Sequence, residues 1–155
     1  MAHRIVILGG GTGGTLAANR LRRLYGDGAE IVVVDRDDRH VYRPGLLFVP
    51  FGLADPERLV RSRRAQLLHG VELRLAEVEQ VDTAGSAVEL AGGETLGYDA
   101  LVIAGGAELQ PEETEGLSFG DRVHTFYTLD GAVALRSALG RFERGRLVVN
   151  MVDLP

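Results

Sequence analysis

The stretch Ile5-Val6-Ile7-Leu8-Gly9-Gly10-Gly11-Thr12-Gly13-Gly14 decides the fold class of this 155-residue chain. Four consecutive apolar residues are typical of a strand that is buried on both faces of a parallel sheet. The glycines end that strand, and a helical pattern then runs from Thr15, with Ala17, Leu21 and Leu24 on one face. A second apolar run, residues 31–34, ends at Asp35. This order predicts a βαβ unit and an α/β fold built on a parallel sheet.

The glycines match a pattern that is typical of dinucleotide binding. Gly9, Gly11 and Gly14 satisfy G-x-G-x-x-G, in which the first glycine permits a tight turn after the strand. The second leaves room for a pyrophosphate to approach the backbone, and the third lets the helix pack closely on the strand. Thr12 and Gly13 precede the expected helix, whose N-terminus presents free N–H groups that attract phosphate. The pattern predicts a Rossmann-like domain with its cofactor at residues 9–14.

Asp35 stands about twenty residues after the last glycine, where an acid at the end of the second strand binds the ribose hydroxyls of an adenosine. Its charge would repel a 2′-phosphate, which disfavours NADP. Arg36 is able to accommodate that phosphate, but we favour an exposed side chain paired with Asp37 or Asp38. The glycines and the acid alone do not separate NAD from FAD.

The middle of the chain predicts a helix and several short strands. Asp55-Pro56-Glu57 is a typical helix start, so we expect a helix from there to about Leu68. The basic run on that helix is interpreted as a solvated face, with an anion or membrane-surface contact as the alternative; it comprises Arg58, Arg61, Arg63 and Arg64. A strand that alternates at Val71, Leu73 and Leu75, with strands near residues 78–81 and 87–90, predicts a small β-meander between Val71 and Leu96.

Three further elements follow. Residues 100–104 form a buried apolar run that ends at Gly105, as expected for another strand of the parallel sheet. Asp130 is expected to cap a helix that runs to about Phe142. Residues 147–149 are apolar and predict a last strand.

Composition excludes several classes of function. Seventeen Lys and Arg against 22 Asp and Glu give a net charge of −5, which argues against a nucleic-acid partner. No apolar run approaches the roughly 20 residues of a membrane span, and the N-terminus does not resemble a signal peptide, so we expect a cytoplasmic protein. Without cysteine, the chain has no disulfide, thiolate metal site or thiol redox step. No metal site is expected, because the histidines lie far apart in sequence, at His3, His40, His69 and His124.

A second motif favours FAD. The segment Tyr98-Asp99-Ala100-Leu101-Val102-Ile103-Ala104-Gly105-Gly106 resembles the Y-D-x-L-V-I-A-x-G segment of two-dinucleotide-domain flavoprotein reductases. The resemblance implies that this strand closes the first half of the FAD domain, and that Ala104 and Gly105 let the backbone lie against the cofactor. Gly105 replaces the usual threonine, which keeps the small size but removes a hydroxyl.

Within these flavoproteins, the chain looks most like the sulfide:quinone oxidoreductase and type II NADH dehydrogenase group. Residues 41–46, with Pro44, resemble the aromatic-x-x-Pro stretch that lies near the flavin in that group. Residues 126–132 and 145–150 resemble the sulfide:quinone branch, although Tyr127 stands where many of its members have a first redox cysteine. The resemblance implies contacts with FAD, and we expect its binding residues to be Gly9, Gly11, Thr12, Gly13, Gly14, Asp35, Arg36, Pro44, Val78, Ala104 and Gly105.

The resemblance also implies an incomplete chain. We expect residues 1–110 to form the first part of an FAD-binding domain, residues 111–144 a connecting loop and helix, and residues 145–155 the first strand of a second dinucleotide-type domain. The later cysteines, the quinone site and any peripheral contact with the inner face of a membrane would lie in further chain, so the 155 residues alone are expected to be inactive. The catalytic residues and the oligomeric state are not predicted.

Three functions stay open. The resemblance favours an FAD-dependent oxidoreductase that passes electrons from sulfide, or a similar small donor, to a quinone. An NADH-linked flavoprotein reductase is the first alternative. A nucleotide-binding module without turnover is an alternative of another class.

Overall fold

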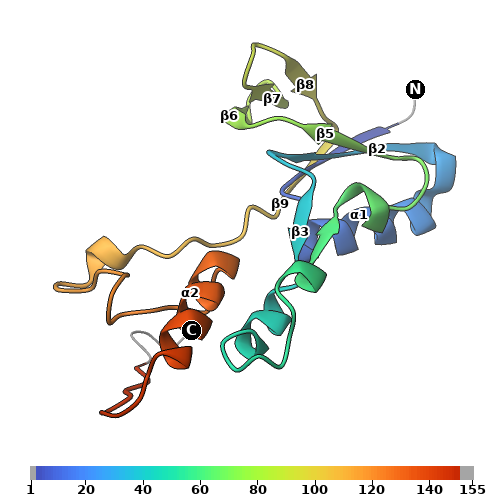
Figure 1. Cartoon of the computed structure of the whole chain (residues 1–155). Coiled ribbons are helices and arrows are strands. Elements are labelled where there is room, and N and C mark those ends of the chain that lie inside the picture. The colour runs from blue at the N-terminus through green and yellow to red at the C-terminus, as the bar shows by residue number, and fades with distance from the viewer. Residues whose placement is uncertain (1–2, 151–155) are drawn as a thin grey trace. The chain divides into compact units, whose positions relative to one another are not determined.

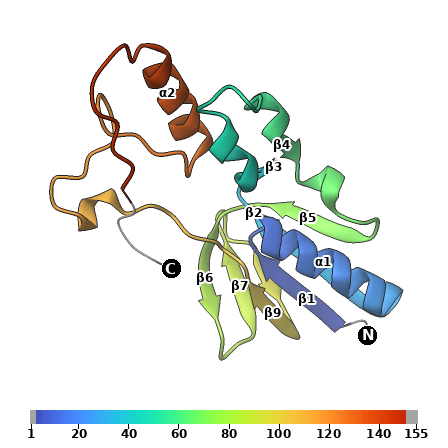
Figure 2. The ribbon, with the colours of Figure 1, turned by 90° about the horizontal axis from the view of Figure 1, so that it is seen from below.

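The computed structural model describes residues 3–150, which form two compact units. Unit 1 comprises the described residues up to Tyr42 together with Val60–Gln110. Unit 2 comprises Arg43–Leu59 and the described residues from Pro111 onward. Figures 1 and 2 together label the helices and strands.

Unit 1 is built on a four-stranded sheet in the order β5-β2-β1-β9, in which every neighbouring pair is parallel. The strands are β1 (His3–Leu8), β2 (Ala29–Asp35), β5 (Val71–Leu75) and β9 (Ala100–Ile103). Helix α1 (Thr12–Tyr25) connects β1 to β2, followed by the 3-10 turn Gly26–Gly28. The expected βαβ unit and the Rossmann-like α/β fold are therefore confirmed, with β5 and β9 at the two edges of the sheet.

Both faces of this sheet are covered, because successive strand residues point to opposite sides. Ile7 and Val33 belong to a buried cluster that includes Ala18 of α1, whereas Val6 and Val32 belong to a second cluster. The second cluster also contains Val88, Leu90 and Leu96 of the antiparallel strands β6 (Val78–Asp82), β7 (Ala87–Leu90) and β8 (Thr95–Gly97). Figure 1 shows α1 on one side of the sheet and β6–β8 on the other. This arrangement explains the continuous apolar runs of β1 and β2.

The meander is smaller than expected. It contains β6, β7 and β8, each antiparallel to its neighbour. Val71, Leu73 and Leu75 do not belong to it, because β5 pairs in parallel with β2 from Ile31 to Asp35. The alternation along β5 places Val71, Leu73 and Leu75 on one face of the sheet and Glu72 and Arg74 on the other. Leu73 is buried on that face, whereas Leu75, at the end of the strand, is exposed.

The helix expected from Asp55 to Leu68 is wrong. This segment forms two short 3-10 turns, Glu57–Leu59 and Arg64–Gln66, on either side of strand β4 (Val60–Ser62). Strand β4 pairs antiparallel with β3 (Arg39–Val41). The start signal is real in part, since the Asp55 carboxylate accepts a hydrogen bond from the amide of Glu57 at 3.0 Å. Pairing with β3 then prevails over the local helix preference.

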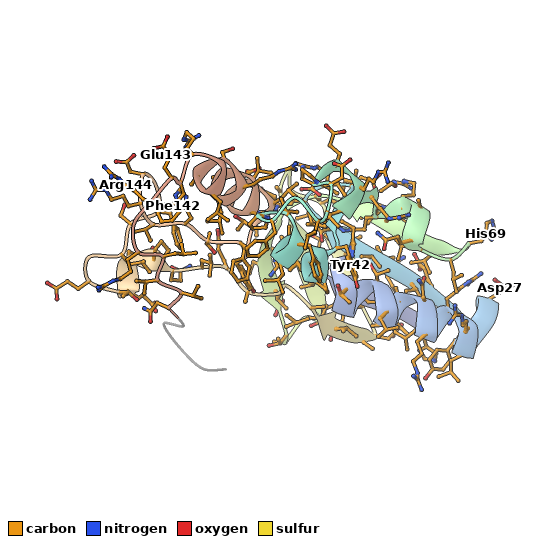
Figure 3. All side chains as sticks on the ribbon, turned by 60° about the horizontal axis from the view of Figure 1, so that its bottom comes forward. Asp27, Tyr42, His69, Phe142, Glu143 and Arg144 are labelled. Carbon is orange, nitrogen blue, oxygen red and sulfur yellow. The ribbon has the colours of Figure 1, made fainter. Side chains whose placement is uncertain are left out.

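Helix α1 begins three residues earlier than expected, at Thr12, and buries Gly14, Thr15 and Ala18. Leu24, expected on the buried face, is 70% exposed in the last turn. Arg22 fixes that end of the helix: its guanidinium donates to the carbonyl of His69 at 3.1 Å and to Asp27 at 2.5 Å. Figure 3 shows Asp27 and His69 beyond this end of α1, and Figure 2 shows α1 running along β1.

Unit 2 contains the 3-10 helix Arg43–Phe48, the turn Pro111–Glu113 and helix α2 (Leu129–Gly140). The N-cap of α2 is Thr128 and not Asp130, since the Thr128 hydroxyl accepts from the amide of Gly131 at 3.1 Å. The helix ends before Phe142, which Figure 3 labels with Glu143 and Arg144 beyond the helix end. None of the helices within residues 3–150 is long and apolar enough to cross a membrane.

The strand expected at residues 147–149 is not formed. These residues have no regular structure, and their side chains are 60–81% exposed. A strand needs a neighbouring strand, and within residues 3–150 unit 2 offers only the isolated bridge between Gly120 and Val123. The assignment of residues 145–155 to a second domain stays a prediction, and residues 151–155 lie outside the described range.

Candidate dinucleotide-binding site

The candidate site lies at the edge of the parallel sheet where the strands end. Strand β1 ends at Leu8, β2 at Asp35 and β9 at Ile103. The sheet order places β2 and β9 on opposite sides of β1, so the turn after β1 stands where the strand order reverses. Open α/β sheets bind ligands in this position, outside the carboxyl ends of the strands.

Two glycines of the turn are required by close packing of the backbone. Gly9 has φ +95°, and a Cβ on it would collide with the carbonyl oxygen of Ala104. A Cβ on Gly14 would collide with the carbonyl oxygen of Gly9. The positive φ of Gly9 and the close packing at Gly14 agree with the roles that the motif gives to its first and third glycines. The close approach of Ala104 to Gly9 is an additional constraint, which the motif does not predict.

Gly11 has different surroundings. A Cβ on Gly11 would meet no atom within 4 Å, so its backbone faces open space. Gly11 is also the N-cap of α1, where it makes no side-chain cap, and the first turn of the helix carries no acidic residue. The amide of Thr15 donates to the carbonyl of Gly11 at 2.9 Å, which leaves the amides of Thr12 and Gly13 without a helical acceptor. An anion fits this cradle of free N–H groups and helix dipole.

The Asp35 carboxylate lies beside the turn, with its side chain 15% exposed. One oxygen, Oδ2, accepts from the amide of Gly10 at 2.6 Å and lies 3.2 Å from Nη2 of Arg63. The other oxygen, Oδ1, has no hydrogen-bond partner among residues 3–150. Asp35 therefore keeps one acceptor for a ligand hydroxyl.

Two neighbouring acids are held in the ionised form. Burial opposes ionisation of Asp37, but hydrogen bonds from the Arg39 amide and from Arg63 lower its pKa below the ordinary value. The Arg64 amide and the Ser62 hydroxyl lower the pKa of Asp38, donating to its carboxylate at 2.8 Å each. These hydrogen bonds connect strand β4 and the turn after it to Asp37 and Asp38, in the loop that follows Asp35.

Arg36 is exposed, as expected, but its expected ion pair is wrong. No salt bridge of Arg36 forms within the described chain; Asp37 pairs with Arg63 instead, at 3.1 Å. Arg36 is the arginine nearest to Asp37 in the sequence. The antiparallel pairing of β3 with β4 nevertheless brings Arg63 closer to the Asp37 carboxylate in space.

The structure places the remaining expected residues in both units. Ala104 lies against the turn and donates its amide to the carbonyl of Leu8 at 2.7 Å, and Gly105 follows it with open space at its Cβ position. Val78 begins β6, two residues after Ala76, whose amide donates to the Asp35 carbonyl at 2.9 Å. Pro44 belongs to unit 2, in the 3-10 helix where the Arg43 guanidinium lies 4.9 Å from the Tyr127 ring.

The sequence analysis did not assign four residues to this site: Gly10, Thr15, His40 and Arg63. The carbonyl of Gly10 accepts from Arg63 Nε at 2.8 Å and from Thr15 Oγ1 at 3.0 Å, and His40 Nδ1 lies 3.5 Å away. Arg63 was expected on a solvated face with the other arginines of its run, but it is buried. No feature of the sequence distinguishes it from those other arginines. Gly10 did carry a signal, because it is a glycine at a position where the motif accepts any residue.

Comparison with known proteins supports the fold described above. Residues 3–149 match the family model described as pyridine nucleotide-disulphide oxidoreductase. Mitochondrial sulfide:quinone oxidoreductase of Mus musculus is 26% identical over 156 aligned residues, covering 99% of this chain and 34% of that protein. Type II NADH:quinone oxidoreductase of Mycobacterium tuberculosis is 34% identical over 117 residues, covering 68% of this chain and 23% of that protein.

A solved structure shows the same fold. Sulfide:quinone oxidoreductase from Aquifex aeolicus superposes with a TM-score of 0.75 at 22% identity, covering 91% of this chain and 32% of that one. The chain spans about a third or less of the length of these proteins. Because the family model matches nearly the whole of this chain, the chain belongs to the pyridine nucleotide-disulphide oxidoreductase family, whose members are FAD-dependent oxidoreductases.

Proposed function

We propose that unit 1 binds the adenosine diphosphate half of FAD, and that the chain is part of an oxidoreductase that passes electrons from sulfide, or a similar small donor, to a quinone. The observation that carries the binding proposal is the open backbone at Gly11, beside a helix N-terminus and a partly free Asp35 carboxylate. The donor and acceptor are supported by the mouse relative, which is named for sulfide and quinone.

Each part of the cofactor has a matching group. The amides of Gly11, Thr12 and Gly13 would donate to the diphosphate, which lies outside the first turn of α1 in folds of this kind. Asp35 Oδ1 would accept from the adenosine ribose hydroxyls. We further propose that Gly14 keeps α1 close to the turn, and that Arg36, Pro44, Val78, Ala104 and Gly105 contact other parts of FAD. When bound, FAD supplies hydride and electron transfer at its flavin ring.

The binding proposal is tested by placing the same side chain at two open glycines. Gly11 and Gly28 both have open space at the Cβ position, and neither has a φ in the left-handed range. Gly28 lies in the turn between α1 and β2, at the opposite end of the sheet from the site. We expect Gly11→Val to abolish binding of ADP and of FAD, because the side chain fills the approach of the diphosphate, and Gly28→Val to leave both unchanged.

Calorimetry with ADP and quenching of FAD fluorescence measure the two affinities. Asp35→Ala should weaken ADP binding by about 1–3 kcal/mol, the scale of a hydrogen bond to a charged group. Wild-type affinity in Gly11→Val would mean that the diphosphate is bound elsewhere.

An NADH-linked reductase is the second candidate, because the mycobacterial relative is named for NADH and quinone. The two donors are distinguished by adding sulfide or NADH, without oxygen, to the FAD-loaded longer protein of which this chain is proposed to be a part, because the 155 residues alone are expected to be inactive. Flavin reduction by sulfide that is faster than with free FAD supports the first candidate. Acceleration by NADH alone supports the second.

A further inference from the structure

Arg63 is buried, with 7% of its surface exposed, whereas Arg61 and Arg64 of the same run are exposed. A buried guanidinium persists only where its donors and its charge are satisfied. Nε donates to the Gly10 carbonyl at 2.8 Å and Nη2 to the Arg39 carbonyl at 2.9 Å. Nη1 donates to the carbonyl and the carboxylate of Asp37, and Asp35 completes the charge balance. Arg63 is therefore a fixed part of unit 1.

The guanidinium contacts the glycine turn at one peptide group. The carbonyl of Gly10 and the N–H of Gly11 belong to the same planar trans peptide, so they point in opposite directions. Arg63, Thr15 and His40 all lie on the carbonyl side of this peptide. The N–H of Gly11 therefore points away from Arg63, and Gly11 is the residue with open surroundings.

A cationic donor on a carbonyl also strengthens the N–H of the same peptide as a donor, since hydrogen bonds in a chain polarise one another. Asp35 holds the other side of Gly10 by accepting from its amide at 2.6 Å. Arg63 and Asp35, which contact each other, thus hold the backbone of Gly10 at both its N–H and its carbonyl.

We propose that Arg63 is a positioning residue for diphosphate binding, acting through the carbonyl of Gly10 to orient and polarise the N–H of Gly11. This inference rests on the proposed function, because it takes the diphosphate of ADP or FAD as the ligand. Arg63 itself does not contact that ligand: its guanidinium is occupied by Gly10, Arg39 and the two acids.

Gly10 is the counterpart of Arg63. A Cβ on Gly10 would collide with Cδ of Arg63 and would lie 2.7 Å from its Nε. The φ of Gly10 is not in the left-handed range, so the backbone itself accepts alanine. The glycine is required by the arginine side chain, and Gly10→Ala should displace Arg63 from the carbonyl.

The test compares ADP with adenosine, which lacks the diphosphate, by NMR titration of the 15N-labelled chain. In Arg63→Gln we expect ADP affinity to fall roughly tenfold or more, which is the scale of the charge-assisted hydrogen bond from the misoriented Gly11 N–H to the diphosphate. Adenosine affinity should fall much less. Arg61→Gln, which removes an exposed charge from the same run, should leave both affinities unchanged. Arg63→Lys, which keeps the charge without the planar fork, should lie between wild type and Arg63→Gln.

Two measurements separate this role from a general loss of structure. In the absence of ligand, Arg63→Gln should move the Gly11 amide proton upfield, because its peptide is less polarised, while the amides of β2 keep their positions. Gly10→Ala should weaken ADP binding in the wild-type background but add little to Arg63→Ala, because the two changes remove the same contact.

The outcomes distinguish the inference from the function on which it rests. Equal weakening of ADP and adenosine, additive effects of Gly10→Ala and Arg63→Ala, or an unmoved Gly11 amide would each overturn the role of Arg63. If the wild-type chain bound neither ADP nor FAD, the proposed function would fail, and the Gly11 amide shift would still decide whether Arg63 polarises the peptide.

Discussion

The two units bury apolar side chains to very different extents. In unit 1 the four-stranded sheet is covered on both faces, and side chains such as Ile7 and Val33 are fully buried. In the described part of unit 2 the buried apolar side chains are those of Leu46, Val49, Pro50 and Ala132. Large apolar residues there remain exposed, among them Phe48, Phe51 and Phe126.

The candidate site lies in unit 1, which is the unit with the larger buried apolar core. The glycine turn, Asp35 and Arg63 all belong to unit 1, where a two-sided core fixes the strand ends. Precise placement of backbone donors requires such support, because small displacements weaken binding strongly. We therefore expect unit 1 to be the more stable unit, and unit 2 to unfold at a lower denaturant concentration than unit 1.

Ile7→Ala should give the largest effect. The Ile7 side chain is fully buried between the sheet and α1, and its truncation should lower the free energy of unfolding of unit 1 by about 2–5 kcal/mol. Urea unfolding followed by the amide signals of β2 measures it. Leu16→Ala, on the exposed side of α1, is the control and should change stability by no more than about 0.5 kcal/mol. A small loss in Ile7→Ala would mean that the core does not hold unit 1 together.

Thr128→Ala should affect unit 2 alone. Its hydroxyl caps α2 by accepting from Gly131, and removal of an N-cap costs about 1 kcal/mol. Hydrogen exchange should quicken at the amides of α2 while those of β1 and β2 stay protected. Ser137→Ala, in the middle of the same helix, should leave α2 amide exchange unchanged or slower. Equal acceleration in both units would show that they unfold together.

The smallest effect concerns pH and should be confined to unit 1. The lowered pKa of Asp38 means that its contribution to stability is present above the ordinary carboxylate value of 3.8 and is lost as the pH falls through the folded-state pKa. In Asp38→Asn, the free energy of unfolding of unit 1 should therefore fall less steeply on acidification than in the wild type. Parallel pH curves for the two proteins would contradict this assignment.

The sequence predicted the elements whose pattern and packing agree. Strands β1 and β2 have apolar runs long enough to fill both faces of a parallel sheet, and the glycine spacing placed the turn between β1 and α1. Strand β9 followed from its apolar run and its final Gly105. The prediction of a helix from Asp55 was wrong, although the helix-start signal is real. The residues that follow it form β4, which pairs with β3 about twenty residues earlier in the chain.

The candidate site was predicted only in part. Asp35 and the three motif glycines could be identified because each has a fixed place in a short pattern. Arg63 could not, since its burial depends on the β3–β4 pairing and on the absence of a side chain at Gly10. The segment that begins at Leu147 was predicted as a strand from its apolar residues, but it is exposed and forms no strand. An apolar run alone is not sufficient, because a strand also needs a neighbouring strand to pair with.

The two edges of the parallel sheet have opposite chemistry, which bears on how the chain behaves at high concentration. Strand β5 carries Glu72 and Arg74, and Arg74 forms ion pairs with Glu72 of the same strand and with Glu94, which precedes β8. Strand β9 reads Ala100-Leu101-Val102-Ile103, without a charge, and Ile103 is 72% exposed. Charged side chains discourage an edge strand from pairing with another chain, whereas a flat apolar edge invites it. Self-association of this protein should therefore begin at β9, and a lysine placed at Ile103 should improve its solubility.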